Sequence, residues 1–345
     1  MTQKTAIVIL NWNGKDFLKK FLQIVCDNSE HCAVIVADNA STDDSVTYLG
    51  QFHPTVEVIL NDQNFGFAEG YNQALTQLKD RFDYYILLNS DIEVTPGWTK
   101  PLIETLSSNP NYFAVQPKIL AYHNKNKFEH AGASGGFIDR DYYPFCRGRI
   151  FDTVEVDTQQ YESQRTIFWA SGACMAVDAD KFHTLTGFDG DFFAHMEEID
   201  LCWRAQRKGY EVLVNPKAKV YHVGGGTLNY QSPKKTFLNF RNNLYMIHKN
   251  HEGFLGGKIL YRLLLDGIAG VKFLVGLQFK HFTAILKAHF AYYGSIAKLQ
   301  RKRKNLKKDA KNNNNLKGVY RGSILYAHFA KGIKKFSQLN QRRFK

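Results

Sequence analysis

The sequence lacks three features that define common protein classes. It has no run of about 18 uncharged apolar residues, so no membrane-spanning helix is predicted. Its N-terminus lacks the basic start, apolar segment and small-residue cleavage site of a secretory signal. The five cysteines form no CxxC pair and are odd in number, which indicates reduced structural thiols. These absences predict a cytoplasmic protein.

Acidic residues are scarce in the last part of the chain. Residues 251–345 contain 21 Lys and Arg but 3 Asp and Glu, a net charge of +18. The whole chain of 345 residues carries +13, so residues 1–250 carry −5. A basic segment of this kind binds phosphate groups, either on a nucleic acid or on an anionic membrane. Composition does not choose between these two partners.

Strand-like and helix-like segments alternate over the first ~120 residues. The strand-like runs are short, apolar and rich in β-branched residues, at 5–10, 33–38, 56–60 and 84–89. The helix-like stretches lie near 15–27, 67–80 and 98–108. This alternation predicts a Rossmann-like α/β fold with a mostly parallel sheet that is covered on both faces. Ligands of such sheets bind outside the carboxyl ends of the strands.

Amide and carboxylate side chains follow all four predicted strands, at 11–14, 38–41, 61–64 and 89–91. Each group alone is compatible with turn formation or helix capping. Together they predict one polar edge. Asp38 can accept hydrogen bonds from a base or a ribose, as acidic residues at strand ends do in nucleotide folds, or it can cap the next helix. The segment NFGFAEGYNQAL (64–75) opens a helix whose glycines permit close backbone approach and whose N-terminus suits phosphate.

Two further groups are typical of metal and acid–base chemistry. Asp91 ends an apolar strand and can hold Mg²⁺ or Mn²⁺ between two phosphates, or cap the next turn. His222 follows a strand and precedes three glycines, so it is either a metal ligand or a packed side chain. Glu197, Glu198 and Asp200 crowd the start of one helix, which is more than capping requires. One of them can act as a general base if burial raises its pKa.

The chain divides into three predicted regions. Residues 1–250 form the α/β domain, with a Gly-, Tyr- and Arg-rich excursion at 123–168. Regular structure resumes with a strand at 170–177, helices near 178–186 and from 196, and strand-like runs at 211–216 and 220–226. Residues 251–300 form amphipathic helices, with Lys258, Arg262 and Asp266 on one stripe. Residues 301–345 form a basic linker and tail, of which 301–315 is expected to be a flexible linker or exposed turn.

In order along the chain, these segments resemble family 2 glycosyltransferases of the GT-A fold, in the rhamnosyltransferase-like branch. The resemblance covers about residues 5–250. Its segments are IVILNWNG, VADNASTDDS, NFGFAEGYNQAL, LLNSDIEV, SGACMAV with GFDGDFFAHMEEIDLCWR, and VYHVGGGT. Two departures stand out: Asn89 replaces the first Asp of the family's D-x-D motif, and Glu198 stands where the catalytic Asp is common.

The resemblance implies an inverting transfer of rhamnose or another hexose in cell-surface polysaccharide synthesis. The donor would be a UDP- or dTDP-sugar, and the acceptor a glycan or lipid-linked glycan. It implies Glu198 as base beside Glu197, and a Mg²⁺ or Mn²⁺ ion on Asp91 and His222. Donor-binding residues would be Asn11, Asn13, Asp38, Asn64, Gly66, Asn72 and Asn89. Acceptor-side residues would be Trp169, Gly172, Asp200, Arg147, Arg149 and Arg241, with Asn242 as a further candidate.

The basic C-terminal helices fit peripheral binding to the anionic inner face of the cell membrane, or packing on the enzyme as an ordinary appendage. A sugar-1-phosphate nucleotidyltransferase would need a Gly-rich loop with a basic residue near the N-terminus, which IVILNWNGKD lacks. A nucleic-acid-binding protein is disfavoured because the basic cluster lacks RNA-stacking motifs, so no nucleic-acid partner is expected. A transferase-like protein without activity is the remaining alternative.

Overall fold

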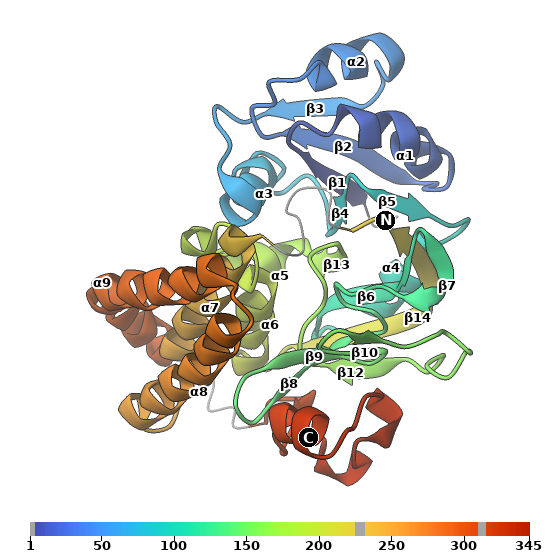
Figure 1. Ribbon diagram of the computed structural model, residues 1–345. Coiled ribbons are helices and arrows are strands. Elements are labelled where there is room, and N and C mark those ends of the chain that lie inside the picture. Colours follow the sequence, from blue (N-terminus) through green and yellow to red (C-terminus); the bar gives the residue numbers. More distant parts are fainter. Residues whose placement is uncertain (1–3, 225–231, 310–314) are drawn as a thin grey trace.

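A computed structural model describes residues 4–224, 232–309 and 315–345 (Figure 1). Its centre is a ten-stranded sheet in which eight strands lie in the order β12-β14-β6-β13-β4-β1-β2-β3, while β5 pairs with β14 and β7 with β6. A separate five-stranded sheet, β11-β10-β9-β8-β15, lies beside it. The mixed α/β architecture confirms the predicted fold class.

The N-terminal half of the sheet is parallel, as predicted. It consists of β1 (Thr5–Asn11), β2 (Cys32–Asp38), β3 (Glu57–Leu60) and β4 (Tyr84–Asn89). On one face it packs against α3 (Gly66–Gln77), and on the other against α1 (Lys15–Asp27), α2 (Ser45–Phe52) and α4 (Thr99–Ser107). Helix α1 packs against the sheet because its buried residues recur at helical spacing along one face. These residues are Leu18, Phe21, Leu22 and Val25.

The other half of the sheet is mixed. Its strands are β5 (Ile92–Val94), β6 (Tyr112–Ala121), β7 (Asn124–Phe128), β12 (Arg165–Ile167), β13 (Cys174–Asp178) and β14 (Glu211–His222). Strand β13 is antiparallel to both neighbours, β4 and β6. It therefore begins beside the carboxyl end of β4, where the Asn89 amide donates to the Ala173 carbonyl at 2.9 Å. Residues 170–173, predicted as strand, precede β13 and are not part of a strand. The predicted runs 211–216 and 220–222 belong to one strand, β14, and residues 225–226 of the second run lie outside the described residues.

The excursion at 123–168 contains six short strands. Besides β7 and β12 it contains β8 (Gly136–Asp139), β9 (Pro144–Cys146), β10 (Arg149–Ile150) and β11 (Thr153–Val154). The chain's last segment joins this small sheet through β15 (Val319–Tyr320), which pairs in parallel with β8. Its aromatic side chains pack there too, because Phe336 and Phe344 contact Phe137 at ring distances of 4.9 and 5.3 Å. The expected basic tail is thus part of the fold.

The remaining helices lie in two places: the longer ones gather on one side of the molecule, and the short ones of the C-terminal segment lie beside the small sheet (Figure 1). They are α5 (Ala179–Thr184), α6 (Glu197–Arg207), α7 (Pro233–Asn250), α8 (Leu255–Val275) and α9 (Phe279–Asp309), with short helices η1 (Gly190–Phe192), η2 (Tyr326–Ala330), η3 (Phe336–Gln338) and η4 (Gln341–Arg343). The prediction of a flexible linker or exposed turn is wrong for residues 301–309, because these residues continue helix α9. Arg303 is buried there and donates to the His248 carbonyl at 2.9 Å. Residues 310–314 lie outside the described residues.

Helix α8 is amphipathic, but its charged stripe faces the protein and its apolar face points outward, the opposite of a typical helix on the surface of a soluble protein. Its predicted stripe of Arg262 and Asp266 is buried, with the guanidinium donating to the Asp266 carboxylate at 2.7 Å and to Asn243 at 2.5 Å. The outward face carries apolar side chains at helical spacing: Leu260, Leu264, Ile268, Val271 and Val275. No helix within the described ranges is long and apolar enough to cross a membrane.

Candidate active site

The carboxyl ends of the four parallel strands form the expected polar edge. Asn11 of β1 lies opposite Asp38 of β2, and Leu10 lies opposite Asn89 of β4. The Asn11 amide donates to Asp38 Oδ2 at 2.9 Å, while Asp38 Oδ1 accepts from the Ser41 amide at 2.8 Å. Asn11 Oδ1 is buried with no hydrogen-bond partner within the described residues. The edge therefore holds oriented polar atoms, of which the Asn11 and Asp38 side chains are buried.

Asn13 and Asn39 tie neighbouring turns together at this edge. Asn13 adopts a left-handed conformation, at a φ of 51°, and its Oδ1 accepts from the Thr42 amide at 2.7 Å. Asn39 was not among the predicted site residues, yet its buried side chain donates to the Gly66 carbonyl at 2.9 Å and accepts from Asn61 at 3.0 Å. Its position directly after Asp38 was the signal available in the sequence.

The start of α3 is arranged differently from the predicted phosphate site. The Phe67 and Ala68 amides both donate to the Phe193 carbonyl, at 2.7 and 3.2 Å, and the Gly66 amide donates to Asn64 Oδ1 at 2.9 Å. These protein acceptors take the amides that a phosphate would need. Gly66 has a φ of 75°, and a Cβ there would lie 2.6 Å from the Phe193 ring. The glycine thus permits close packing of α3 on the segment before α6.

Asn72 also contacts that segment rather than the strand edge. Its side chain accepts from the Phe188 amide and donates to the Phe188 carbonyl, both at 2.9 Å. A side chain that pairs in this way with one peptide group acts as a fixed tether. We therefore assign Asn72, with Asn64 and Gly66, a role in supporting the site instead of direct donor contact.

Asp91 and His222 lie together, as the sequence predicted. Strand β5 pairs with the end of β14, so His222 is brought beside the turn that carries Asp91. His222 Nε2 lies 3.1 Å from Asp91 Oδ1, and both side chains are buried. On the other side of the ring, Nδ1 lies 3.3 Å from Glu129 Oε2. Burial alone would lower the pKa of His222, but the two carboxylates outweigh it and raise the pKa to about 10.

The pair fits a cation that is completed by ligands from outside the protein. In the described part of the chain, no group of three or more His, Cys, Asp or Glu side chains is arranged to hold a metal. Two ligands at about 2.1 Å on neighbouring octahedral corners lie about 3 Å apart, close to the observed separation. Mg²⁺ characteristically keeps few protein ligands and takes the others from water and phosphate.

Glu197 and Glu198 begin α6 after a strained approach. Phe193, His195 and Met196 have φ values of 62°, 69° and 73°, conformations that cost free energy in residues with side chains. Within the described residues, neither Glu197 Oε2 nor Glu198 Oε2 has a hydrogen-bond partner, and both atoms are buried. Burial raises the pKa of Glu198 to about 7. Burial and the charge of Glu198 raise the pKa of Glu197 well above its usual value.

Arg241 and Asn242 of α7 hold this strained segment. Asn242 Nδ2 lies 2.9, 2.9 and 2.7 Å from the carbonyl oxygens of Phe192, Ala194 and His195. The Arg241 guanidinium donates to the Asp191 and Phe192 carbonyls, at 3.1 and 3.0 Å. The predicted acceptor role of these two residues is replaced by a positioning role, because their polar atoms are directed at the backbone.

Among the other predicted acceptor residues, only Gly172 lies beside the catalytic candidates. A Cβ at Gly172 would lie 3.0 Å from the Phe67 ring and 3.9 Å from Glu198 Cβ. Because Gly172 adjoins Ala173, which bonds to Asn89, it connects the α6 start to the strand edge. Gly172 thus permits the Phe67 ring to pack closely against the backbone next to Glu198.

The remaining four acceptor candidates are buried and bonded elsewhere. Asp200 is fully buried and accepts from Arg204, Lys249 and Asn250 at 2.7–3.0 Å. Trp169 donates to the Phe137 carbonyl at 3.0 Å. Arg147 donates to the Ser134 carbonyl at 2.9 Å, and Arg149 to the Phe151 carbonyl at 3.3 Å. The structure places these side chains in structural networks, which sequence spacing could not distinguish from a site.

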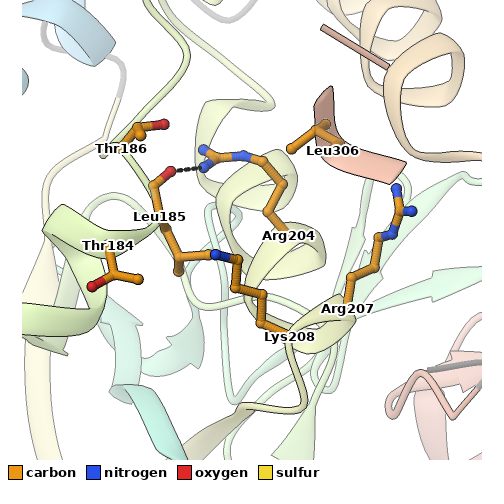
Figure 2. A pocket seen from close by; sticks show the side chains of 7 residues that line it. All are labelled: Thr184, Leu185, Thr186, Arg204, Arg207, Lys208 and Leu306. Carbon is orange, nitrogen blue, oxygen red and sulfur yellow. Dashed lines mark hydrogen bonds between the residues drawn. The ribbon is translucent and has the colours of Figure 1, made fainter. Parts of the chain in front are cut away.

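Two cavities are relevant to ligand binding. An open one of about 490 Å³ is lined by residues around Glu129: Ala121, Lys127, Phe128, Glu129, His130, Asp152, Val154 and Val223. Figure 2 shows the other, of about 60 Å³, where Arg204, Arg207 and Lys208 meet Leu306. It lies at the C-terminal end of α6, roughly 15 Å along the helix from the two glutamates. Cations there complement the helix dipole, so this cavity needs no ligand to explain it.

The family assignment follows from the comparison with known proteins. The model of the family described as glycosyl transferase family 2 matches residues 6–185, which is more than half of the chain. The chain belongs to this family. It is therefore a glycosyltransferase, and the match spans the strand edge with Asp38, Asn89 and Asp91.

Curated relatives agree with this assignment. An N-acetylglucosaminyl-diphospho-decaprenol L-rhamnosyltransferase of Mycobacterium tuberculosis is 25% identical over 236 residues, covering 64% of this chain and 76% of the relative. Rhamnosyltransferase WbbL of Escherichia coli is 24% identical over 225 residues, covering 63% and 82%.

Solved structures support the GT-A fold. A mannosyltransferase from Pyrobaculum calidifontis, in complex with GDP-Man and Mn²⁺, superposes with a TM-score of 0.52 at 12% identity, over 85% of this chain and 88% of that one. GalNAc-T7 with UDP, GalNAc and Mn²⁺ gives a TM-score of 0.55 at 16% identity, over 72% of this chain and 48% of that one.

Removing the Asn242 amide should impair catalysis more than substrate binding. Asn242→Ala removes hydrogen bonds to a strained segment, so we expect about 2–3 kcal/mol less stability toward unfolding and a lower kcat with little change in KM. Urea unfolding and steady-state kinetics measure the two effects. The matched control is Asn243→Ala, whose neighbouring side chain bonds to Tyr142 and Arg262 instead. An equal fall of kcat in both variants would contradict the positioning role.

Proposed function

We propose that this enzyme transfers a hexose such as rhamnose, with inversion, from a nucleoside-diphosphate donor to a lipid-linked glycan. The observation that carries the proposal is Glu198, whose carboxylate oxygen Oε2 is buried without a hydrogen-bond partner among the described residues. The acceptor class is taken from the lipid-linked substrate named for the mycobacterial relative.

Glu198 is the better placed of the two glutamates to act as base. A general base works best when its pKa is near the operating pH, and the pKa of Glu198 is about 7. Burial and the charge of Glu198 raise the pKa of Glu197 well above its usual value, which disfavours two adjacent negative charges in the site. Glu198 takes the proton of the acceptor hydroxyl, while the hydroxyl oxygen forms a bond to the anomeric carbon of the donor sugar. The bond from that carbon to the diphosphate breaks on the opposite face, and the diphosphate leaves with the electron pair.

The polar edge binds the donor in this proposal. Asn11, Asn13, Asp38 and Asn89 surround the strand ends where nucleotides bind in such folds. Asp91 and His222 would hold a divalent cation, Mg²⁺ or Mn²⁺, whose charge stabilises the departing diphosphate. The Mn²⁺ named for both solved relatives supports this choice of metal. The donor base, uracil or thymine, is set by contacts beyond these residues.

We further propose that the apolar face of α8 rests on an anionic membrane. Leu264, Ile268 and Val275 are 62%, 67% and 79% exposed, an arrangement that is unfavourable in water. The face continues through Leu277 and Phe279 at the turn into α9, next to Lys272 and Lys280. Apolar side chains flanked by cations suit the boundary between acyl chains and acidic headgroups. A surface of this kind would bring the enzyme to a lipid-linked acceptor at the inner face of the cell membrane.

Loss of the Glu198 carboxylate should slow the chemical step. Glu198→Gln is expected to lose about 2–4 kcal/mol of transition-state stabilisation, while donor binding measured by calorimetry persists. Wild-type kcat/KM should fall as pH drops below about 7, because the base becomes protonated, and this limb should vanish in the variant. The donor for these assays comes from a hydrolysis screen of nucleotide sugars. Near-normal turnover of the variant would rule out Glu198 as the base.

The same substitution should stabilise the fold at alkaline pH. A carboxyl group whose pKa is raised by folding stabilises the native state below its unfolded pKa and loses that contribution as pH rises through the folded pKa. The Glu198→Gln side chain does not ionise, so its contribution to stability is not lost as pH rises. We therefore expect the free energy of unfolding of the variant at pH 8 to exceed that of wild type by an amount on the order of 1–3 kcal/mol. Equal stability of the two proteins from pH 5 to pH 8 would argue against the raised pKa.

Asp91→Ala should abolish the effect of Mn²⁺ on nucleotide binding. Calorimetry with UDP and dTDP, each with and without Mn²⁺, measures this dependence. Asp38→Asn is the matched control, since it should weaken nucleotide binding equally in both conditions. A Mn²⁺ enhancement that survives in Asp91→Ala would exclude Asp91 as a ligand.

Charging the α8 face should release the enzyme from vesicles. Full-length protein should float with phosphatidylglycerol vesicles and much less with phosphatidylcholine, and the double variant Leu264→Glu, Ile268→Glu should stay in solution. Phe52→Glu on α2 is the control, because Phe52 is similarly exposed at 59%. A wild-type dimer that the double variant dissociates, without vesicle binding, would identify the face as a contact between copies and refute the membrane role.

A further inference from the structure

His222 lies between two carboxylates that contact opposite sides of its ring. Asp91 Oδ1 is 3.1 Å from Nε2, and Glu129 Oε2 is 3.3 Å from Nδ1. All three side chains are less than one-tenth exposed. Because the two ring nitrogens point in different directions, Glu129 cannot share with Asp91 a cation bound at Nε2. Its position needs another explanation.

The sheet brings Glu129 to this place with a fixed backbone. Glu129 directly follows β7, which pairs antiparallel with β6, and its amide donates to the Ile119 carbonyl at 3.0 Å. Strand β6 also pairs with β14 up to His222, which lies opposite Ala121. The Glu129 carboxylate accepts a further hydrogen bond from the Ala131 amide. Its orientation is therefore determined from both ends of the side chain.

We infer that Glu129 is a positioning residue of the metal site: its carboxylate lies 3.3 Å from Nδ1 of His222, without the alignment of a hydrogen bond in this structure, and in the metal-bound enzyme it accepts the Nδ1–H and so directs Nε2 toward Asp91 and the cation. This inference rests on the proposed metal role of Asp91 and His222. Histidine ligands commonly donate their second ring N–H to a carboxylate, which fixes the tautomer and makes the ligand nitrogen more basic. A cation that binds at Nε2 would displace the proton there, and the ring would keep the Nδ1 proton that faces Glu129.

A purely structural role must be separated from this one. Glu129 supports the turn at Ala131, and its charge acts on the nearby Lys235 and His130. Glu129→Gln keeps the side-chain length and an oxygen for the Ala131 amide, but it loses the negative charge that faces Nδ1. The conservative variant therefore preserves the turn while weakening the hold on the ring.

Mn²⁺ binding followed by electron paramagnetic resonance tests the inference without an activity assay. We titrate the full chain with Mn²⁺, alone and with UDP, and expect Glu129→Gln to bind Mn²⁺ about 10–100-fold more weakly than wild type. Glu155→Gln is the matched control: Glu155 is also buried, and it accepts from Tyr161 at 3.0 Å and from the Phe336 amide at 2.9 Å. This control should bind Mn²⁺ like wild type, and thermal melting checks that each variant is folded.

The outcomes distinguish this inference from the proposed function. Wild-type Mn²⁺ affinity in a folded Glu129→Gln protein would overturn the positioning role and leave Asp91 and His222 as ligands. Equal losses in Glu129→Gln and Glu155→Gln would assign the effect to the stability of residues 123–168, which also overturns it. Absence of Mn²⁺ binding in wild type would refute both the metal role and this inference.

Discussion

The Phe193 carbonyl, which accepts from the first amides of α3, couples the two halves of the site. One partner in this contact is the helix that covers the strand edge, and the other is the segment that leads into Glu197 and Glu198. The contact is close because Gly66 has no side chain to keep the Phe193 ring away. Asn72 adds a second tie through the Phe188 peptide group. The proposed catalytic carboxylates are thus placed relative to the polar strand edge by hydrogen bonds to the backbone, which tolerate little displacement.

The sequence predicted the parts of the fold that local patterns determine. Apolar runs with β-branched residues gave the four parallel strands, and polar residues at their ends gave the edge. Asp91 and His222 were paired by the family resemblance, and the antiparallel pairing of β5 with β14 places them at 3.1 Å. Features that depend on pairing between segments far apart in the sequence could not be predicted from local patterns. Glu129 reaches His222 only through three adjacent strands, and β15 joins β8 across 180 residues of sequence.

Helix α8 illustrates a pattern whose meaning depends on its surroundings. The spacing of Lys258, Arg262 and Asp266 indicated an amphipathic helix but not which stripe faces outward. In the structure the ion pair of Arg262 and Asp266 turns inward, where Asn243 and His289 complete its hydrogen bonds. A buried ion pair is tolerated when its remaining polar atoms are satisfied, and it leaves the apolar stripe for the surface. This inversion is the reason that we propose a membrane-binding role for α8, since an ordinary appendage would bury its apolar side.

The start of α6 concentrates features that oppose folding. Phe193, His195 and Met196 adopt left-handed conformations, and two buried glutamates with raised pKa values follow directly. Each feature costs stability, so the segment would relax unless its surroundings hold it. Asn242 and Arg241 supply that restraint through five contacts to carbonyl oxygens. The strain sits where a base must be kept desolvated and aimed, and the residues that offset it lie on α7, outside the region that the family model matches. Under the proposed roles of Glu197 and Glu198, helix α7 after the sheet supports the catalytic carboxylates directly.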